Sequence, residues 1–226
     1  MVKSMYSFLL IPILILLSFS QPCIPQEISA QQEIDRKVKE FLDDYRWRDL
    51  NVPEVDGKIL YDLIIENKYK SALEVGTSTG HSGIWIAWAL SKTGGKLITI
   101  EIDRRRHEQA VANFRECGLE EFIDARLTDA HELVPELEGP FDFVFIDADK
   151  DWYPNYAKAI IPKLVTGGCI TAHNVSERGR GRRGRGGRGG YESEYLEYMR
   201  SLPFMETTLD LNARSGLAVS YKRKDR

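Results

Sequence analysis

The sequence predicts a single-domain α/β fold built around a mainly parallel sheet. From Gln31 onward, stretches with helical periodicity alternate with short apolar runs that are typical of buried strands. Alternation at this close spacing favours helices packed on a mainly parallel sheet. The chain has 226 residues, of which 42% are hydrophobic, and this is enough for one well-buried domain. We expect residues 51–226 to form that domain, preceded by a linker and helix at 21–50.

The individual elements follow from local patterns. Two helical patterns come first, at 31–48 and 52–68. Five apolar runs then predict buried strands, at 71–75, 96–101, 122–127, 141–147 and 168–172. Helices fit between these strands, and a further helix at 191–202 precedes a terminal strand pair at 205–211 and 216–223.

The first 20 residues predict a signal peptide or a membrane anchor. An apolar run from Phe8 to Phe19 is followed by a candidate cleavage site, with the small residues Ser18 and Ser20 just before it. The run is short for a membrane span, which needs about 20 apolar residues. We therefore expect export or membrane attachment, and a cytoplasmic location only if this segment results from a mis-assigned start.

Residues 178–190 form the only low-complexity segment, with six arginines, seven glycines and no acidic residue. Such a composition cannot build a core or hold a helix. Its charge could attract an anionic substrate, a membrane surface with anionic lipids, or nucleic acid. Nucleic acid is the least favoured, because the whole chain carries a net charge of −3 and no aromatic residue interrupts the run. A solvated insertion with no ligand remains open.

The first predicted strand leads into the loop "LEVGTSTGHSG", a candidate ligand-binding turn. Gly76 and Gly80 permit a tight turn and a close approach to a ligand at the start of the next helix. A dinucleotide-binding loop would require glycine where Ser78 stands, so this ligand class is disfavoured. Glu101 ends the second strand, where an acid can accept hydrogen bonds from a ribose diol.

Polar residues gather at the ends of the fourth and fifth strands. Asp147, Asp149 and Lys150 follow one apolar strand, and His173 and Asn174 follow the next. Open α/β sheets hold their ligands at this carboxyl edge. Asp147, His173 and Asn174 together make an oxygen- and nitrogen-rich candidate site for a divalent cation.

Taken in order, the glycine loop, Glu101, "TDAHE", "FIDADKDWYPNY" and "HN" resemble the class I S-adenosylmethionine-dependent O-methyltransferases, specifically the catechol and caffeoyl-CoA O-methyltransferase group. The resemblance covers about Asn51 to Lys222, and "DADKDWYPNY" is its most specific part. It implies a Rossmann-like seven-stranded, mostly parallel sheet with helices on both faces and an antiparallel C-terminal strand.

The resemblance also implies roles for individual residues. The methionine end of the cofactor would lie along Glu74, Gly76, Thr77 and Ser82, with Gly80 in the same loop. Glu101 would hold the ribose, Asp129 and Ala130 would border the adenine, and Asp149 would lie beside the cofactor. Asp147 and Asn174 would bind a metal ion, Mg²⁺ or Mn²⁺, and Lys150 would be the catalytic lysine.

His173 is the main departure from this pattern, since the best-known members have Asp-Asn where this chain has His173-Asn174. A neutral imidazole can bind a metal, but the loss of a carboxylate removes one negative charge and favours softer ions than Mg²⁺. Two mechanisms stay open for a phenolic acceptor. Either a divalent cation lowers the pKa of the hydroxyl and orients the ring, or His173 acts as a metal-independent general base.

Two classes of function are therefore compatible with the sequence. The first is a small-molecule O-methyltransferase, which the ordered motifs favour. The second is a binding module that keeps the fold but uses the arginine-glycine segment for a polyanion, and failure to bind S-adenosylmethionine would favour it. The helix at 31–48 could cover the active site or form a homodimer contact, and nothing in its residues decides between these.

Overall fold

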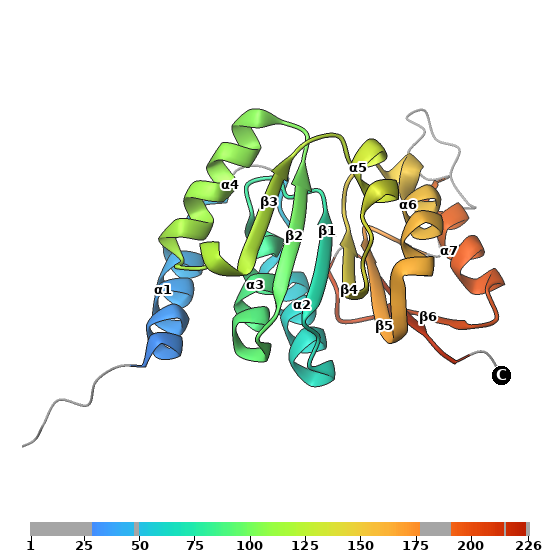
Figure 1. Ribbon diagram of the computed structural model, residues 1–226, viewed down its shortest axis with the longest axis horizontal. Helices are drawn as coiled ribbons and strands as arrows, with labels where there is room; N and C mark the ends of the chain where they lie inside the picture. Colours follow the sequence, from blue (N-terminus) through green and yellow to red (C-terminus); the bar gives the residue numbers. More distant parts are fainter. Residues whose placement is uncertain (1–28, 48–49, 177–190, 215, 225–226) are drawn as a thin grey trace, which may run out of the picture.

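The computed structural model describes residues 29–47, 50–176, 191–214 and 216–224, which form one seven-stranded sheet with helices around it (Figure 1). The strands are β1 Ser71–Val75, β2 Lys96–Glu101, β3 Ile123–Leu127, β4 Phe141–Ile146, β5 Leu164–His173, β6 Met205–Asp210 and β7 Leu217–Lys222. The helices are α1 Ala30–Asp44, α2 Glu54–Asn67, α3 His81–Thr93, α4 Arg104–Glu116, α5 Ala130–Glu136, α6 Tyr153–Ile160 and α7 Tyr191–Ser201.

The strand order is β3-β2-β1-β4-β5-β7-β6. Strands β1 to β5 pair in parallel, whereas β7 is antiparallel to both of its neighbours. This confirms the predicted, mostly parallel sheet with an antiparallel C-terminal strand. The chain places β2 and β3 on one side of β1, and then β4 and β5 on the other side, so the strand order switches between β1 and β4. The carboxyl edge at such a switch point is where open α/β sheets bind ligands.

Two apolar clusters cover the two faces of the sheet. Helices α1 to α4 pack with one cluster, and α5 to α7 pack with the other. Along β4 the side chains alternate between them, with Phe143 and Phe145 in the first cluster and Val144 and Ile146 in the second. A strand buried on both faces reads as a continuous apolar run, which is why the sequence identified it.

Some boundaries differ from the sequence prediction for local reasons. The strand expected at 168–172 begins at Leu164. The sequence prediction missed its first half because that half is mostly exposed and contains Thr166 and glycines rather than an apolar run. The strand expected from Phe122 begins one residue later, since Phe122 closes a short 3₁₀ turn. The helix expected at 31–48 ends at Asp44.

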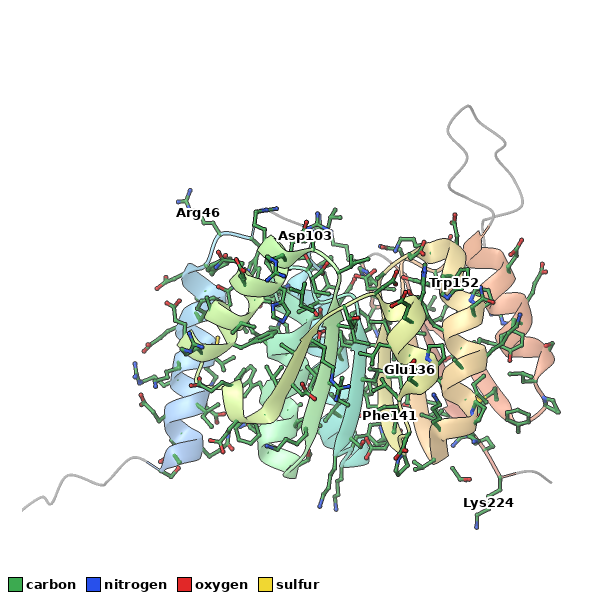
Figure 2. All side chains as sticks on the ribbon, turned by 45° about the horizontal axis from the view of Figure 1, so that its top comes forward. Arg46, Asp103, Glu136, Phe141, Trp152 and Lys224 are labelled. Atoms are coloured by element: carbon green, nitrogen blue, oxygen red, sulfur yellow. The ribbon has the colours of Figure 1, made fainter. Side chains whose placement is uncertain are left out.

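Figure 2 shows the direction of the sheet through three labelled residues: Asp103 and Trp152, which follow β2 and β4, lie toward one end of the molecule, and Phe141, which begins β4, lies toward the other. The predicted N-terminal segment at 1–20 and the arginine-glycine segment at 178–190 lie outside the described residues. Within the described residues, no helix has the length and apolar character needed to cross a membrane.

Candidate active site

The ends of β4 and β5 bring two groups of predicted site residues together. Ile146 pairs with Ala172, so Asp147 and His173 follow as neighbours at the carboxyl edge. The backbone N–H of Asp147 donates to the carbonyl of Val75 at 2.9 Å, which ties the end of β4 to the start of the glycine loop on β1. The structure thus unites Asp147 and His173 at the switch point.

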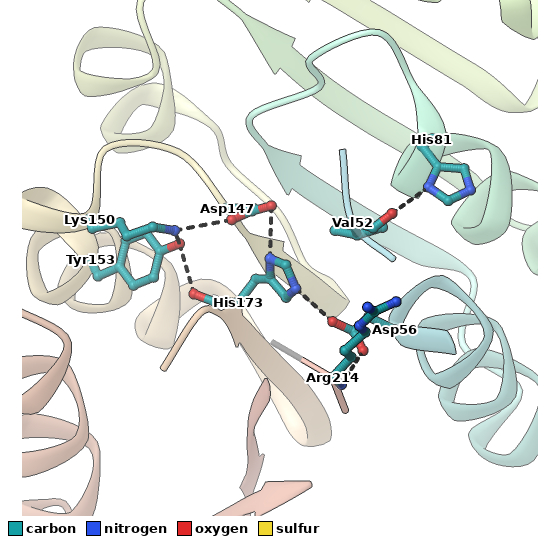
Figure 3. Close-up of polar contacts among 8 residues, drawn as sticks. All are labelled: Val52, Asp56, His81, Asp147, Lys150, Tyr153, His173 and Arg214. Carbon is teal, nitrogen blue, oxygen red and sulfur yellow. Dashed lines mark hydrogen bonds and ion pairs between the residues drawn. The ribbon is translucent and has the colours of Figure 1, made fainter. Parts of the chain in front are cut away.

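His173 lies between two carboxylates (Figure 3). Its Nδ1 is 3.1 Å from Asp147 Oδ2, and its Nε2 is 2.8 Å from Asp56 Oδ2. The histidine is buried, with 4% of its surface exposed. Burial alone would lower the pKa of His173, but the hydrogen bonds and charges of Asp147 and Asp56 outweigh it and raise the pKa above its usual value.

This arrangement limits what His173 can do chemically. A general base needs a nitrogen lone pair within reach of the proton that it removes. Both ring nitrogens of His173 already face carboxylates, and the ring is almost fully enclosed. The geometry therefore favours a ligand or an orienting group over a base that meets the substrate directly.

Lys150 forms an ion pair with Asp147. Its Nζ lies 3.3 Å from Asp147 Oδ1 and 3.3 Å from the hydroxyl of Tyr153. The Tyr153 hydroxyl in turn donates to the carbonyl of His173 at 3.2 Å, and the tyrosine is fully buried. Lys150 keeps about 37% of its side chain exposed, so its ammonium group is accessible to a ligand at the sheet edge.

Asn174 completes the predicted metal-binding set. It has a left-handed backbone conformation, with φ of 57°, and is partly buried. Nδ1 of His173 and Oδ2 of Asp147, 3.1 Å apart, suit neighbouring corners of one ion, because metal–ligand bonds of about 2.1 Å at a right angle put two donors about 3 Å apart. No three His, Cys, Asp or Glu side chains cluster as a metal site in the described part of the chain, and the predicted set contains two such groups and one amide.

The glycine loop after β1 shows why two of its predicted residues are glycine. Gly76 and Gly80 both have positive φ, at 100° and 98°. A Cβ on Gly76 would lie 2.7 Å from the Cβ of Ala148, and one on Gly80 would lie 2.7 Å from the ring of Phe114. The close approach that these glycines permit in the structure is therefore to neighbouring protein segments.

Glu74, in β1 beneath this loop, is a buried acidic residue with an unsatisfied oxygen. It is fully buried, and its Oε2 accepts a hydrogen bond from Thr99 at 2.6 Å, whereas its Oε1 has no partner among the described residues. Burial raises the pKa of Glu74 to about 7, and the neighbouring hydroxyls of Ser82 and Thr99 only partly oppose this. A buried oxygen without a donor indicates that a donor-bearing or cationic ligand belongs there.

Thr77 and Ser78 follow Gly76 in the glycine loop. The side chain of Thr77 is buried and its hydroxyl pairs with that of Thr99, so only its backbone can line a ligand. Ser78, which the sequence used only to exclude a dinucleotide, has a buried hydroxyl with no partner among the described residues. The unsatisfied atoms of Glu74 and Ser78 fit a cofactor that carries hydrogen-bond donors at this loop.

Glu101 shapes the loop as well as marking the end of β2. Its Oε2 accepts from the backbone N–H of Ser78 at 2.7 Å, and its Oε1 accepts from the N–H groups of Ile102 and Asp103. Each carboxylate oxygen can accept more than one hydrogen bond. The predicted contact with a ribose diol is thus compatible with these bonds.

The remaining predicted cofactor residues lie around α5. Asp129 caps this helix by accepting from the N–H of His131 at 2.8 Å, and Ala130 begins it. Asp149 Oδ2 lies 2.6 Å from Nε2 of His131, whose ring packs on Trp152 with 4.3 Å between centroids. Sequence reasoning missed His131, although it lies within the "TDAHE" motif.

Asp56 was also missed. An acidic residue in the first turn of a helix is ordinarily a favourable partner of the helix dipole, so its type and position gave no signal. Its burial, at 1% exposed, and its contact with His173 become visible only in three dimensions.

Comparison with known proteins places these features in a family context. The sequence profile of a family described as O-methyltransferase matches residues 26–182. A catechol O-methyltransferase from Niastella koreensis is 37% identical over 135 residues, which are 58% of this chain and 61% of that protein. Caffeoyl-CoA O-methyltransferase 1 from Eucalyptus globulus is 30% identical over 149 residues, which are 64% of this chain and 60% of that protein. The match thus spans about three fifths of the length of these curated relatives.

Solved structures show the same fold. Cofactor-bound Rv0187 from MTB superposes with a TM-score of 0.72 at 26% identity, over 85% of this chain and 90% of that one. An O-methyltransferase from Bacillus cereus in complex with SAH gives a TM-score of 0.70 at 23% identity, over 88% of this chain and 94% of that one.

Proposed function

The chain belongs to the O-methyltransferase family, and we propose on this basis that it transfers a methyl group from S-adenosylmethionine to the hydroxyl oxygen of a small phenolic acceptor, with a divalent cation at the sheet edge. The observation that carries the proposal is the convergence of Asp147, Lys150 and His173 beside the glycine loop, beneath which Glu74 of β1 holds an unsatisfied buried oxygen. The names of the curated relatives, catechol and caffeoyl-CoA O-methyltransferases, support a phenolic acceptor.

The cofactor would lie over the glycine loop. S-adenosylmethionine supplies a methyl group that is already activated by its sulfonium charge, so the protein mainly has to align the acceptor oxygen with it. Glu74 and Ser78 offer unsatisfied atoms to the methionine part, and Glu101 retains capacity for the ribose hydroxyls. Asp129 and Ala130 would border the adenine, and Asp149 would lie beside the cofactor.

The cation would be held by Asp147 Oδ2, His173 Nδ1 and the side-chain oxygen of Asn174. A bound divalent cation would lower the pKa of a coordinated phenol and orient its ring. The separation of 3.1 Å between the first two donors supports this set. Because one ligand is an imidazole, Mn²⁺ should support activity at least as well as Mg²⁺.

Lys150 would hold the phenolate oxygen as it forms. Its ammonium group lies beside Asp147 and retains access to solvent. A positive charge held at that place stabilises the developing phenolate before methyl transfer. The alternative in which His173 is the base is less well supported, because both of its nitrogens face carboxylates.

The test is release of S-adenosylhomocysteine by the full chain, with catechol and caffeoyl-CoA as separate acceptors. We expect turnover with Mn²⁺ or Mg²⁺, loss of turnover with excess chelator, and recovery when the metal is restored. Turnover that survives the chelator would remove the cation from the mechanism. Failure to bind S-adenosylmethionine in a calorimetric titration would refute methyl transfer itself and favour a binding module.

A further inference from the structure

Asp56 is a buried carboxylate that lies 117 residues before its partner His173 in the sequence. It lies in the first turn of α2, with 1% of its surface exposed. Oδ2 faces Nε2 of His173 at 2.8 Å, and Oδ1 accepts the backbone N–H of Arg214 at 2.7 Å (Figure 3). Burying a carboxylate is costly unless it is paired, so its pairing with His173 calls for an explanation.

The surrounding structure holds Asp56 in place. Gly57, the next residue, allows α2 to lie against Trp85 of α3, since a Cβ there would be 2.3 Å from the indole ring. Just before α2, the carbonyl of Val52 accepts a hydrogen bond from Nδ1 of His81 at 2.7 Å. The start of α2 is therefore fixed from two sides, and the carboxylate of Asp56 is presented to His173 from a rigid element.

The contacts of His173 define which nitrogen can bind a ligand. The shorter contact, to Asp56, is satisfied when Nε2 carries the hydrogen and donates it. In a neutral ring Nδ1 then carries the lone pair, and it points toward Asp147 Oδ2, which is also an acceptor. Two acceptors 3.1 Å apart need a cation between them or a proton on Nδ1.

A divalent cation can satisfy both of these acceptors at once. With neutral His173, the two carboxylates of Asp56 and Asp147 contribute two negative charges, which a divalent cation balances. A proton on Nδ1 would leave one net negative charge on the trio, which Lys150, with its Nζ 3.3 Å from Asp147 Oδ1, would offset. Geometry favours the cation, because Nδ1 and Oδ2 at 3.1 Å suit neighbouring corners of one ion. Histidines that bind metals commonly donate their second N–H to a carboxylate, which orients the ring and strengthens the ligand.

We infer that Asp56 is a positioning residue: it holds the Nε2–H of His173 so that Nδ1 serves as the metal ligand beside Asp147. The inference rests on the proposed function, because it assumes a cation at this edge. The Asp56–His173 pair then acts as one anionic ligand unit. Its negative charge lies on the Asp56 carboxylate, at the Nε2 side of the imidazole. Asp56 itself touches neither substrate nor cofactor.

The experiment measures Mn²⁺ binding to the full chain without acceptor, by calorimetry, for wild type and Asp56→Asn. The expected result is a dissociation constant about 10- to 100-fold weaker in the variant, the usual cost of removing such an orienting carboxylate. Asp142→Asn is the matched control, because Asp142 is a half-buried carboxylate that accepts two backbone N–H groups at the opposite end of β4. This control should bind Mn²⁺ as wild type does.

A spectroscopic measurement separates positioning from general destabilisation. In metal-free protein with isotope-labelled histidine, the Nε2–H signal of His173 should be protected and should shift in Asp56→Asn. His81 has its own fixed partners and serves as the internal reference. In a His173→Asp background, Asp56 has no imidazole N–H to accept, and its carboxylate would repel the new carboxylate at position 173. Asp56→Asn should therefore no longer weaken Mn²⁺ binding in that background.

The outcomes distinguish this inference from the proposed function. Unchanged Mn²⁺ affinity and unchanged His173 signals in Asp56→Asn would overturn the positioning role even if the enzyme is active. An absence of Mn²⁺ binding to wild type would also overturn it, and S-adenosylmethionine binding by the same sample would then show whether methyl transfer still stands. An equal loss in Asp142→Asn would assign the effect to general destabilisation and overturn the inference.

Discussion

Replacing Glu74 with glutamine should change how the stability of the protein depends on pH. Burial raises the pKa of Glu74 from an ordinary value of 4.5 to about 7, and its Oε1 has no partner among the described residues. Because the pKa in the folded state is the higher one, the associated stability is fully present below pH 4.5 and is lost as the pH rises through about 7. At about 1.4 kcal/mol per pKa unit, the loss amounts to about 3 kcal/mol.

The assay is urea unfolding of wild type and Glu74→Gln, without ligand, at about pH 5 and about pH 8. The variant should gain stability relative to wild type by up to about 3 kcal/mol as the pH rises, because glutamine has no proton to lose. Taking the difference between the two proteins cancels the titration of other groups. A difference that does not vary with pH would refute the reasoning.

S-adenosylmethionine provides a second arm of this test. A cationic ligand near Glu74 should favour the ionised carboxylate and so offset its cost of burial. The cofactor should therefore stabilise wild type more than Glu74→Gln at about pH 8, since ligand stabilisation follows affinity for the folded state. Equal stabilisation of both proteins would mean that Glu74 does not face the cofactor.

Three further predictions follow from the packing and the charges. Burial lowers the pKa of His81 to about 4, so the stability that comes from its neutral ring is present above pH 6.5 and is lost as the pH falls toward 4. Urea unfolding at about pH 7 and about pH 5 should therefore show a smaller loss of unfolding free energy at the lower pH for His81→Gln than for wild type. Gly57→Ala should lower the free energy of unfolding by about 1–3 kcal/mol, since the new Cβ meets Trp85; an unchanged urea midpoint would contradict the tight packing. Lys150→Met should reduce kcat by about 10²–10³-fold while calorimetry shows intact cofactor binding, and Lys158→Met, on the neighbouring helix, should leave kcat unchanged.

Much of the candidate site could be predicted from the sequence because its signals are local. Asp147 and Lys150 follow a continuous apolar strand, and His173 ends the next, so the rule that parallel strands present their carboxyl ends at one edge was enough to bring them together. Other features escaped because side-chain type does not reveal burial. Thr77 turned inward to pair with Thr99, and the oxygen of Glu74 was left without a donor.

By itself the sequence determined the order of the elements, the parallel sheet and the edge that carries the site, because hydrophobic periodicity and strand-end residues are properties of short segments. Only the tertiary structure decided the environment of His173. Its partner Asp56 is 117 residues away in the chain, and the two meet because α2 packs closely on α3 next to the end of β5. Contacts between distant segments depend on how whole elements pack, and that packing turned a histidine with several conceivable roles into one held between two carboxylates.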